Sequence, residues 1–263
     1  MQPSSADSEA ALIAAPTGPL LVPAKSEGSS EVRLSLVIPT YEESENLLPL
    51  LAQLTTILDA RLPGRYELIV VDDDSRDRTW QLAQSACSQF RSLRVMRRVG
   101  ERGLSSAVVR GWQVARGDVL AAIDADLQHP PEVVAKLYEL IRRGADLAVA
   151  SRNAPGGGVS TWSFRRRLIS RGAQLLGLCV LPDVVGRVSD PLSGYFMLRR
   201  ETIAGIALRP LGYKILLELL ARGRIAKIAE QGYVFRERGE GSSKVSTKLY
   251  VEYVLHLLRM RFS

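Results

Sequence analysis

The chain has 263 residues, and its 35 lysines and arginines against 28 aspartates and glutamates give a formal net charge of +7. With 46% hydrophobic and 24% charged residues, it has the composition of a globular protein that can bury a sizeable core. Two widely separated cysteines, Cys87 and Cys179, exclude a disulfide scaffold. The lack of roughly 18 uninterrupted apolar residues argues against a membrane span in the chain as given.

The first 31 residues are slightly acidic and rich in serine, alanine, proline and glycine, which predicts a disordered tail over 1–31. No basic flank precedes the apolar stretch Ala10–Ala15, so a secretory signal is not expected. Together with the scarcity of cysteine, this favours a cytoplasmic protein.

From residue 32 onward, short apolar runs alternate with stretches of helical periodicity. Strands are expected at 34–39, 66–71, 93–97, 118–123 and 146–150. Helices are expected at 77–90, 104–115 and 131–143, and around Leu47–Leu58, with Asn46 as the N-cap and Pro49 in the first turn. The alternation predicts an α/β fold, a mostly parallel sheet with helices on both faces.

In such a sheet, ligands bind at the carboxyl ends of the strands. The residues that follow the expected strands are polar, namely 39–43, 72–75, 124–126 and 151–152. No glycine-rich dinucleotide fingerprint follows the first strand, and no phosphate-binding lysine loop occurs. The sequence therefore argues against a dinucleotide dehydrogenase and a P-loop NTPase.

Asp124 and Asp126 directly follow a predicted strand, and Gln128 continues the same spacing. Such oxygen ligands suit Mg²⁺, which completes its coordination with substrate phosphates, so a nucleoside diphosphate is the natural ligand. Two acids in a loop are common, but the acidic ends of neighbouring strands strengthen the case. Asp72 and Asp73 are expected either to form a turn and cap a helix or to bind a nucleobase or ribose.

Four motifs resemble those of the inverting glycosyltransferases of family 2. They are V-I-P-T-Y-E-E-S-E-N-L at 37–47, V-D-D-D-S-R-D-R-T at 71–79, D-A-D-L-Q-H-P-P-E at 124–132 and D-P-L-S-G-Y-F at 190–196. Two later runs, G-Y-K-I-L-L-E-L at 212–219 and F-R-E-R-G-E-G-S-S-K at 235–244, are similar to dolichol-phosphate mannose synthase and its bacterial polyprenyl-phosphate relatives. The resemblance extends over residues 32–262 and implies a GT-A (Rossmann-like) fold that joins a nucleotide sugar to a lipid phosphate.

By these motifs, the resemblance implies the following residues for nucleotide-sugar binding: Pro39, Tyr41, Glu43, Val71, Asp73, Asp124, Ala125, Asp126, Arg152, Lys214, Arg238 and Lys244. It implies Asp124, Asp126 and Gln128 as ligands of Mg²⁺ or Mn²⁺, and Asp126, Arg238 and Lys244 as catalytic residues. Several cations suit a site that brings a diphosphate and a lipid phosphate together. Two roles stay open: Lys214 could instead be a solvated helix residue, and Asp190 could be either an ordinary loop acid or a site residue.

Some residues depart from the family pattern. Arg78 replaces the glycine of the usual D-G-T, Asp74 stands where Asn or Gly is common, and G-E-R-G-L-S-S-A at 100–107 replaces a more glycine-rich run. Gly232 stands where proline is usual. Because Arg78 is expected near the nucleotide, the identity of the base stays open.

The expected reaction is a single in-line displacement with inversion at the anomeric carbon. A lipid monophosphate is already ionised at neutral pH, so no general base is needed. The resemblance favours mannose from GDP-mannose as the donor. Glucose from UDP-glucose, transfer to a hydroxyl acceptor, and an inactive nucleotide-sugar-binding protein remain alternatives.

Two segments suggest contact with a membrane surface. Ser163–Leu181 combines Arg165, Arg166, Arg167 and Arg171 with leucines, and 248–262 is apolar and ends in arginines, although both could instead pack on the core. We therefore expect a GT-A domain over 32–235, then a phosphate-binding loop and membrane-proximal amphipathic helix over 236–263. The expected location is the cytoplasmic face of a membrane, with a small membrane subunit as a further partner. Nucleic-acid binding is not expected, because the strand ends are acidic.

Overall fold

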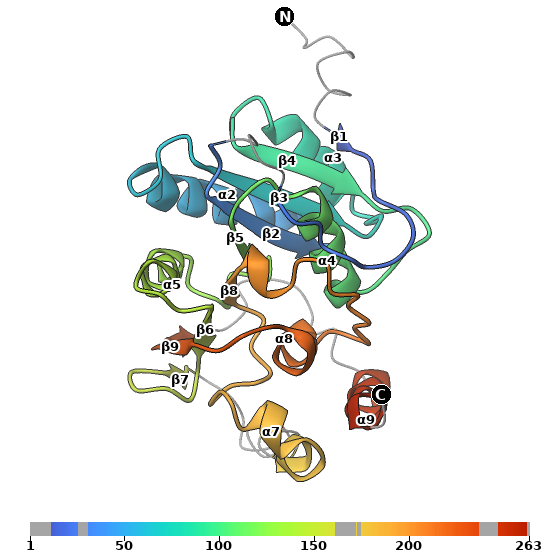
Figure 1. Ribbon diagram of the computed structural model, residues 1–263. Coiled ribbons are helices and arrows are strands. Elements are labelled where there is room, and N and C mark those ends of the chain that lie inside the picture. The colour runs from blue at the N-terminus through green and yellow to red at the C-terminus, as the bar shows by residue number, and fades with distance from the viewer. Residues whose placement is uncertain (1–11, 26–30, 161–171, 173–174, 237–246, 262–263) are drawn as a thin grey trace, which may run out of the picture.

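The computed structural model describes residues 12–25, 31–160, 172, 175–236 and 247–261 (Figure 1). Its strands are β1 (Leu12–Ile13), β2 (Leu34–Thr40), β3 (Tyr66–Asp72), β4 (Leu93–Arg97), β5 (Val119–Ala122), β6 (Leu147–Ser151), β7 (Gly158–Val159), β8 (Phe196–Arg199), β9 (Ile228–Gly232) and β10 (Val234–Phe235). Its α-helices are α2 (Ser44–Asp59), α3 (Thr79–Ala86), α4 (Leu104–Val114), α5 (Val133–Arg142), α7 (Pro182–Val185), α8 (Ile215–Arg222) and α9 (Thr247–Arg261).

Within these residues, eight strands form one sheet in the order β1-β4-β3-β2-β5-β8-β6-β9. β8 runs antiparallel to both of its neighbours, and the other pairings are parallel. β7 and β10 pair separately. The predicted mixed α/β architecture with a mostly parallel sheet is confirmed.

Apolar side chains on both faces of the strands explain why helices cover both faces. Every residue of β2 is buried, and its side chains alternate between two cores. Leu36 lies in the core shared with α2, α3 and α5, whereas Val37 lies in the core shared with α4 and α8. Figure 1 shows these helices flanking the sheet.

The order of the strands creates a switch point beside β2. The chain runs outward from β2 to β3 and β4, and then returns to place β5 on the other side of β2. In an open parallel sheet, connections that leave in opposite directions open a crevice at the carboxyl ends of the two central strands. This edge therefore holds the residues that follow β2, β3 and β5.

The helix after β2 begins earlier than expected. α2 starts at Ser44, and Asn46 is a buried first-turn residue whose amide donates to Glu43 Oε2 at 3.0 Å. The prediction of Asn46 as the N-cap was therefore wrong, and Pro49 lies in the second turn. Asparagine is a common N-cap residue, so the sequence suggests a cap at Asn46, although here its side chain reaches back to Glu43 from within the helix.

Part of the expected N-terminal tail is placed against the domain. β1 pairs with β4 at the edge of the sheet, and Val22 is fully buried in the core under α4. Residues 12–25 therefore differ from the expectation of disorder. Their contacts are with residues far along the chain, which composition does not reveal.

The C-terminal helix α9 joins the domain through a few buried side chains. Leu257 packs with Leu181, Val185 and Leu217, and His256 Nε2 lies 3.2 Å from Glu218 Oε2 of α8. Most of the expected amphipathic segment 163–181 lies outside the described residues, although 175–180 is helical. None of the helices in the described ranges is long and apolar enough to cross a bilayer.

We predict that Arg78→Gly increases the free energy of unfolding by about 1 kcal/mol. Arg78 precedes α3 with φ of +63°, in the left-handed region that glycine adopts without steric cost. Urea unfolding measures the change. Arg76→Gly is the matched control, because Arg76 is exposed nearby without a positive φ, and there glycine should destabilise. Equal effects of the two substitutions would contradict the explanation.

Candidate active site

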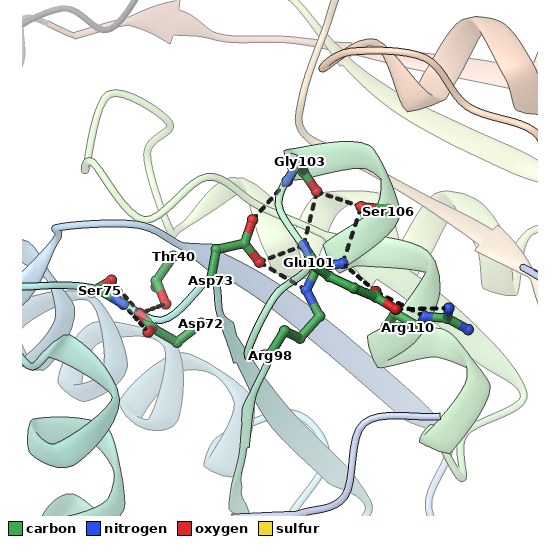
Figure 2. A network of polar contacts seen from close by, with 9 residues as sticks. All are labelled: Thr40, Asp72, Asp73, Ser75, Arg98, Glu101, Gly103, Ser106 and Arg110. Carbon is green, nitrogen blue, oxygen red and sulfur yellow. Dashed lines mark hydrogen bonds and ion pairs between the residues drawn. The ribbon is translucent and has the colours of Figure 1, made fainter. Parts of the chain in front are cut away.

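Asp72 joins the ends of β2 and β3 (Figure 2). Thr40 Oγ1 donates to Asp72 Oδ2 at 2.8 Å, and the Ser75 hydroxyl and backbone N–H donate to the same carboxylate at 2.6 and 2.8 Å. The side chain is buried, and burial raises the pKa of Asp72 in spite of these donors. Asp72 therefore has the turn-forming role that the sequence left open.

Asp73 is bound on both carboxylate oxygens (Figure 2). Arg98 donates to Oδ1 through Nε at 2.7 Å and through Nη2, and the Gly103 N–H donates to Oδ2 at 2.8 Å. Burial raises the pKa of Asp73, and the charge of Arg98 opposes the rise. The carboxylate is fixed in one orientation at the carboxyl end of β3, next to the crevice.

The other residues expected at the nucleotide differ in their burial and in the groups that their side chains contact. Tyr41 follows β2, and the Arg102 guanidinium lies over its ring at 4.6 Å from the centroid. Glu43 accepts from Asn46 and is mostly buried. Pro39 and Val71 are paired strand residues, and Val71 packs in the core, so its side chain is part of the fold.

The D-A-D tripeptide lies in a tight turn after β5. Asp126 Oδ1 accepts the Gln128 N–H at 3.1 Å, and Leu127 between them has φ of +58°. The Gln128 amide donates to the carbonyl of Arg236, the residue that follows β10, at 3.2 Å, which links the turn to the end of that strand. The side chain of Ala125 is buried in the core, which anchors the turn.

Asp124 is approached by His129 from the same turn and by Gly194 from the loop before β8. His129 Nε2 lies 3.3 Å from Asp124 Oδ2, and the His129 ring is enclosed by Tyr195, Tyr233 and Phe235. A Cβ on Gly194 would lie 2.7 Å from the same oxygen. The loop before β8 therefore passes so close to the carboxylate that a larger residue at 194 would displace it.

The side-chain oxygens of the D-A-D turn fit a hard divalent cation. The turn offers two carboxylates and one amide oxygen, the ligand types that Mg²⁺ and Mn²⁺ take. Among the described residues, no cluster of three or more His, Cys, Asp or Glu side chains could enclose a metal. An ion held by two carboxylates needs further ligands from water or from a phosphorylated substrate, in agreement with a nucleoside diphosphate.

Two cations, Arg152 and Lys214, lie near Asp124, and its negative charge acts on both. Arg152, directly after β6, donates to both oxygens of Asp190 at 2.6 and 2.7 Å. Burial would raise the pKa of Asp190, but the hydrogen bonds and charge of Arg152 lower it. Lys214 Nζ donates to the Leu192 carbonyl at 2.8 Å, and burial together with the charge of Arg152 lowers the pKa of Lys214 to about 8.

The structure thus brings Asp124, Arg152 and Lys214 close enough for their charges to interact, and the strand order places the residues after β2 and β3 at the same edge of the sheet. Arg238 and Lys244 lie outside the described residues. Sequence reasoning missed Arg98, His129 and Gly194, and left Asp190 undecided. Gly194 and His129 lie within two of the quoted motifs, so their positions were visible although their contacts were not.

Comparison with known proteins identifies relatives along most of the chain. The family described as Glycosyl transferase family 2 matches residues 35–203. The chain is 46% identical to a dolichol-phosphate mannosyltransferase of Pyrococcus furiosus, over 87% of this chain and 64% of that protein. It is 37% identical to the dolichol-phosphate mannosyltransferase of Saccharomyces cerevisiae, over 86% of each. It is 33% identical to an undecaprenyl-phosphate mannosyltransferase of Micrococcus luteus, over 87% of this chain and 93% of that one.

Solved structures share the fold. Glucosyl-3-phosphoglycerate synthase from Mycobacterium tuberculosis, in complex with Mn²⁺, UDP-glucose and phosphoglyceric acid, aligns with a TM-score of 0.67 at 22% identity. The alignment covers 89% of this chain and 80% of that one. The same enzyme with Mg²⁺ and UDP aligns with a TM-score of 0.66 at 19% identity, over 93% and 88% of the two chains. This likeness confirms the expected GT-A-like fold.

We predict that Gly194→Ala weakens Mn²⁺ binding about 10- to 100-fold while the protein stays folded. The new methyl group would displace the Asp124 carboxylate, a flexible side chain, rather than the backbone. Mn²⁺ binding followed by electron paramagnetic resonance and folding followed by circular dichroism test this. Gly158→Ala is the control, because its Cβ meets nothing within 4 Å. Unchanged Mn²⁺ affinity in Gly194→Ala would show that Asp124 is not a metal ligand.

Proposed function

The chain belongs to glycosyl transferase family 2, and from that premise we propose that it transfers a sugar, mannose from GDP-mannose, to a polyprenyl or dolichyl phosphate. The names of the relatives support this acceptor and this sugar. The observation that carries the proposal is the joining of the D-A-D turn to two cations through the loop 190–194. That arrangement offers oxygen ligands on one side and phosphate-binding groups on the other.

The diphosphate of the donor would lie between these two sides. Asp124, Asp126 and Gln128 would hold Mg²⁺ or Mn²⁺, which when bound neutralises charge on the diphosphate leaving group. Lys214 contributes a cation whose position is set by the Leu192 carbonyl. Asp190 holds Arg152 through two hydrogen bonds, so this guanidinium is oriented before any substrate binds.

The nucleoside would extend toward β2 and β3. Asp73 would accept from the base or ribose, and the Tyr41 ring would pack on the base. Pro39, Glu43 and Val71 would shape this part of the site, and the Ala125 backbone would lie against the sugar nucleotide. Because Asp73 already accepts from Arg98 and Gly103, it is preorganised rather than free to rotate.

The reaction that this site favours is one in-line displacement. An oxygen of the lipid phosphate attacks the anomeric carbon, the bond to the diphosphate breaks, and the electron pair leaves with the nucleoside diphosphate. The anomeric configuration inverts. The acceptor is ionised at neutral pH, so no side chain has to remove a proton. Arg238 and Lys244, from the sequence motif, would position the two phosphates, and Asp126 would contribute as a ligand of the metal ion.

A lipid acceptor requires access to a bilayer. Val254, Leu255 and Leu258 of α9 are exposed, as are Leu175, Leu176 and Leu178, and basic residues end α9. Exposed leucines beside arginines suit the surface of an anionic membrane. We propose that the protein binds the cytoplasmic face of a membrane peripherally, with a small membrane subunit as a candidate partner.

The alternative donor is UDP-glucose, because the structural neighbour was crystallised with that compound. A hydroxyl acceptor and a catalytically inactive binding protein are further alternatives. Transfer of radiolabel from GDP-mannose and UDP-glucose to a short polyprenyl phosphate in the presence of Mn²⁺ separates them. A labelled lipid that is lost with EDTA supports the proposal, and the active donor identifies the sugar.

In the same assay, we predict that Asp126→Ala reduces transfer at least about 100-fold, because a lost metal ligand removes stabilisation of the leaving group. Asp59→Ala is the control, since Asp59 is exposed at the C-terminal end of α2, away from the crevice. Near-normal turnover of Asp126→Ala would reject the assigned metal site. No product with either donor, in a protein that binds nucleotide, would reject the proposed acceptor.

We predict that kcat/KM for the donor falls as the pH rises through about 8, where Lys214 loses its proton in the free enzyme. Below that pH the ammonium attracts the diphosphate, and above it the neutral amine does not. Lys214→Arg keeps its charge, so its profile should stay level to higher pH even if its activity is lower. Profiles measured with Mg²⁺ test this, and parallel declines in both proteins would exclude Lys214 as the cause.

A further inference from the structure

Residues 12–25, called here the N-terminal strap, are held to the domain by backbone hydrogen bonds and by apolar side chains that pack on its core. The Leu208 N–H donates to the Leu20 carbonyl at 2.9 Å, and the Gly205 N–H donates to the Val22 carbonyl at 3.0 Å. Val22 is fully buried. The strap therefore occupies a defined path from β1 at the sheet edge to the segment after β8.

Two side chains one turn apart on α4 bind the middle of the strap. Arg110 Nη2 donates to the Gly18 carbonyl at 3.1 Å. Gln113 Nε2 donates to the carbonyls of Pro19 and Leu21 at 3.0 and 3.1 Å, and Gln113 Oε1 accepts from Arg110 Nη1 at 3.0 Å. The position of the Arg110 guanidinium thus depends on the strap.

From Arg110, alternating charges lead to Asp73, the residue that follows β3 (Figure 2). Arg110 donates to Glu101 at 3.1 and 3.3 Å, Glu101 also accepts from Arg98 Nη1 at 3.3 Å, and Arg98 binds Asp73. Arg98 is almost fully buried, and its remaining N–H groups donate to Ser106 and to the Gly103 carbonyl. Every donor of this guanidinium has a partner, so it has a single well-defined position.

We propose that the N-terminal strap positions the nucleotide-binding carboxylate Asp73, acting through Arg110, Glu101 and Arg98 as positioning residues. The inference rests on the proposed function, in which Asp73 binds the nucleoside of the donor. The same loop carries Arg102, which lies over the Tyr41 ring, so fixing Glu101 also fixes the second side chain expected at the base. The strap thereby acts on the nucleoside part of the site and leaves the metal and phosphate part unchanged.

The test is calorimetric binding of GDP and UDP in the presence of Mg²⁺, with inorganic pyrophosphate as a probe that lacks the nucleoside. We expect Arg110→Met to weaken the preferred nucleotide about 3- to 30-fold and to leave pyrophosphate within about twofold. Glu101→Gln, at a half-exposed position, should act in the same direction and serves if Arg110→Met is poorly folded. Arg199→Met is the control, because Arg199 also donates to two backbone carbonyls but contacts neither the strap nor this network.

A double-mutant cycle with Asp73→Asn tests whether the effect of Arg110 on nucleotide binding passes through Asp73. If the strap acts through Asp73, Arg110→Met has no further effect on nucleotide affinity in the Asp73→Asn background. Undiminished affinity in both Arg110→Met and Glu101→Gln would overturn the proposal, as would equal loss of nucleotide and pyrophosphate, or a full effect in the Asp73→Asn background. Asp73→Asn with wild-type affinity would also overturn it.

The transfer assay separates this inference from the proposed function. Lipid product formed by the wild-type protein, together with unchanged nucleotide affinity in Arg110→Met, rejects the role of the strap alone. Weaker nucleotide binding in Arg110→Met, with no transfer to any lipid phosphate by the wild type, rejects the transferase proposal alone.

Discussion

The structure depends on how buried carboxylates are kept in place at the edge of a parallel sheet. Parallel strands bring the residues that follow them to one edge, and here several of those residues are acids. A buried acid that lacks donors is destabilising, so each acid requires fixed partners. Asp73 has Arg98 and the Gly103 N–H, and Asp190 has Arg152. These pairs fix the loops that carry their members at the carboxyl edge of the sheet.

The pairing also prepares the site for anions. Arg152 is bound on one side by Asp190, and Lys214 is held by a backbone carbonyl, so neither cation has to be ordered when a phosphate arrives. The burial that lowers the pKa of Lys214 also places its charge in a region of low dielectric, where attraction to a phosphate is stronger. Lys214 is therefore protonated in a smaller fraction of molecules, but its interaction with a phosphate is stronger when it is charged. A diphosphate with a divalent cation is the ligand that such an arrangement suits.

Local features could be predicted from the sequence, and contacts between distant residues could not. The apolar run 34–39 identifies a buried strand because both faces of the sheet are covered, and D-A-D directly after a strand identifies the turn of Asp124. The pairs Asp73–Arg98 and Arg152–Asp190 join residues 25 and 38 positions apart, so they depend on strand order and register. The strap was missed because its backbone hydrogen bonds and the packing of Ile13, Leu20 and Val22 join it to residues far along the chain, which composition does not reveal. The early start of α2 was missed because Asn46 caps nothing and instead binds Glu43 from within the helix.

Because the strap binds α4 through backbone carbonyls, substitutions are restricted more strongly on α4 than at the strap residues that supply these carbonyls. Carbonyls of Gly18, Pro19 and Leu21 accept the hydrogen bonds, and another residue type would offer the same oxygen wherever it can adopt the same conformation. At Gly18, with φ of +81°, that conformation favours glycine. The donors are side chains of α4, and no substitution of Arg110 reproduces its forked geometry. Among proteins that keep this arrangement, Pro19 and Leu21 can vary, while Gly18, the buried Val22 and the two α4 positions are constrained. Two such segments can then share little sequence beyond these positions although they follow the same path along the domain.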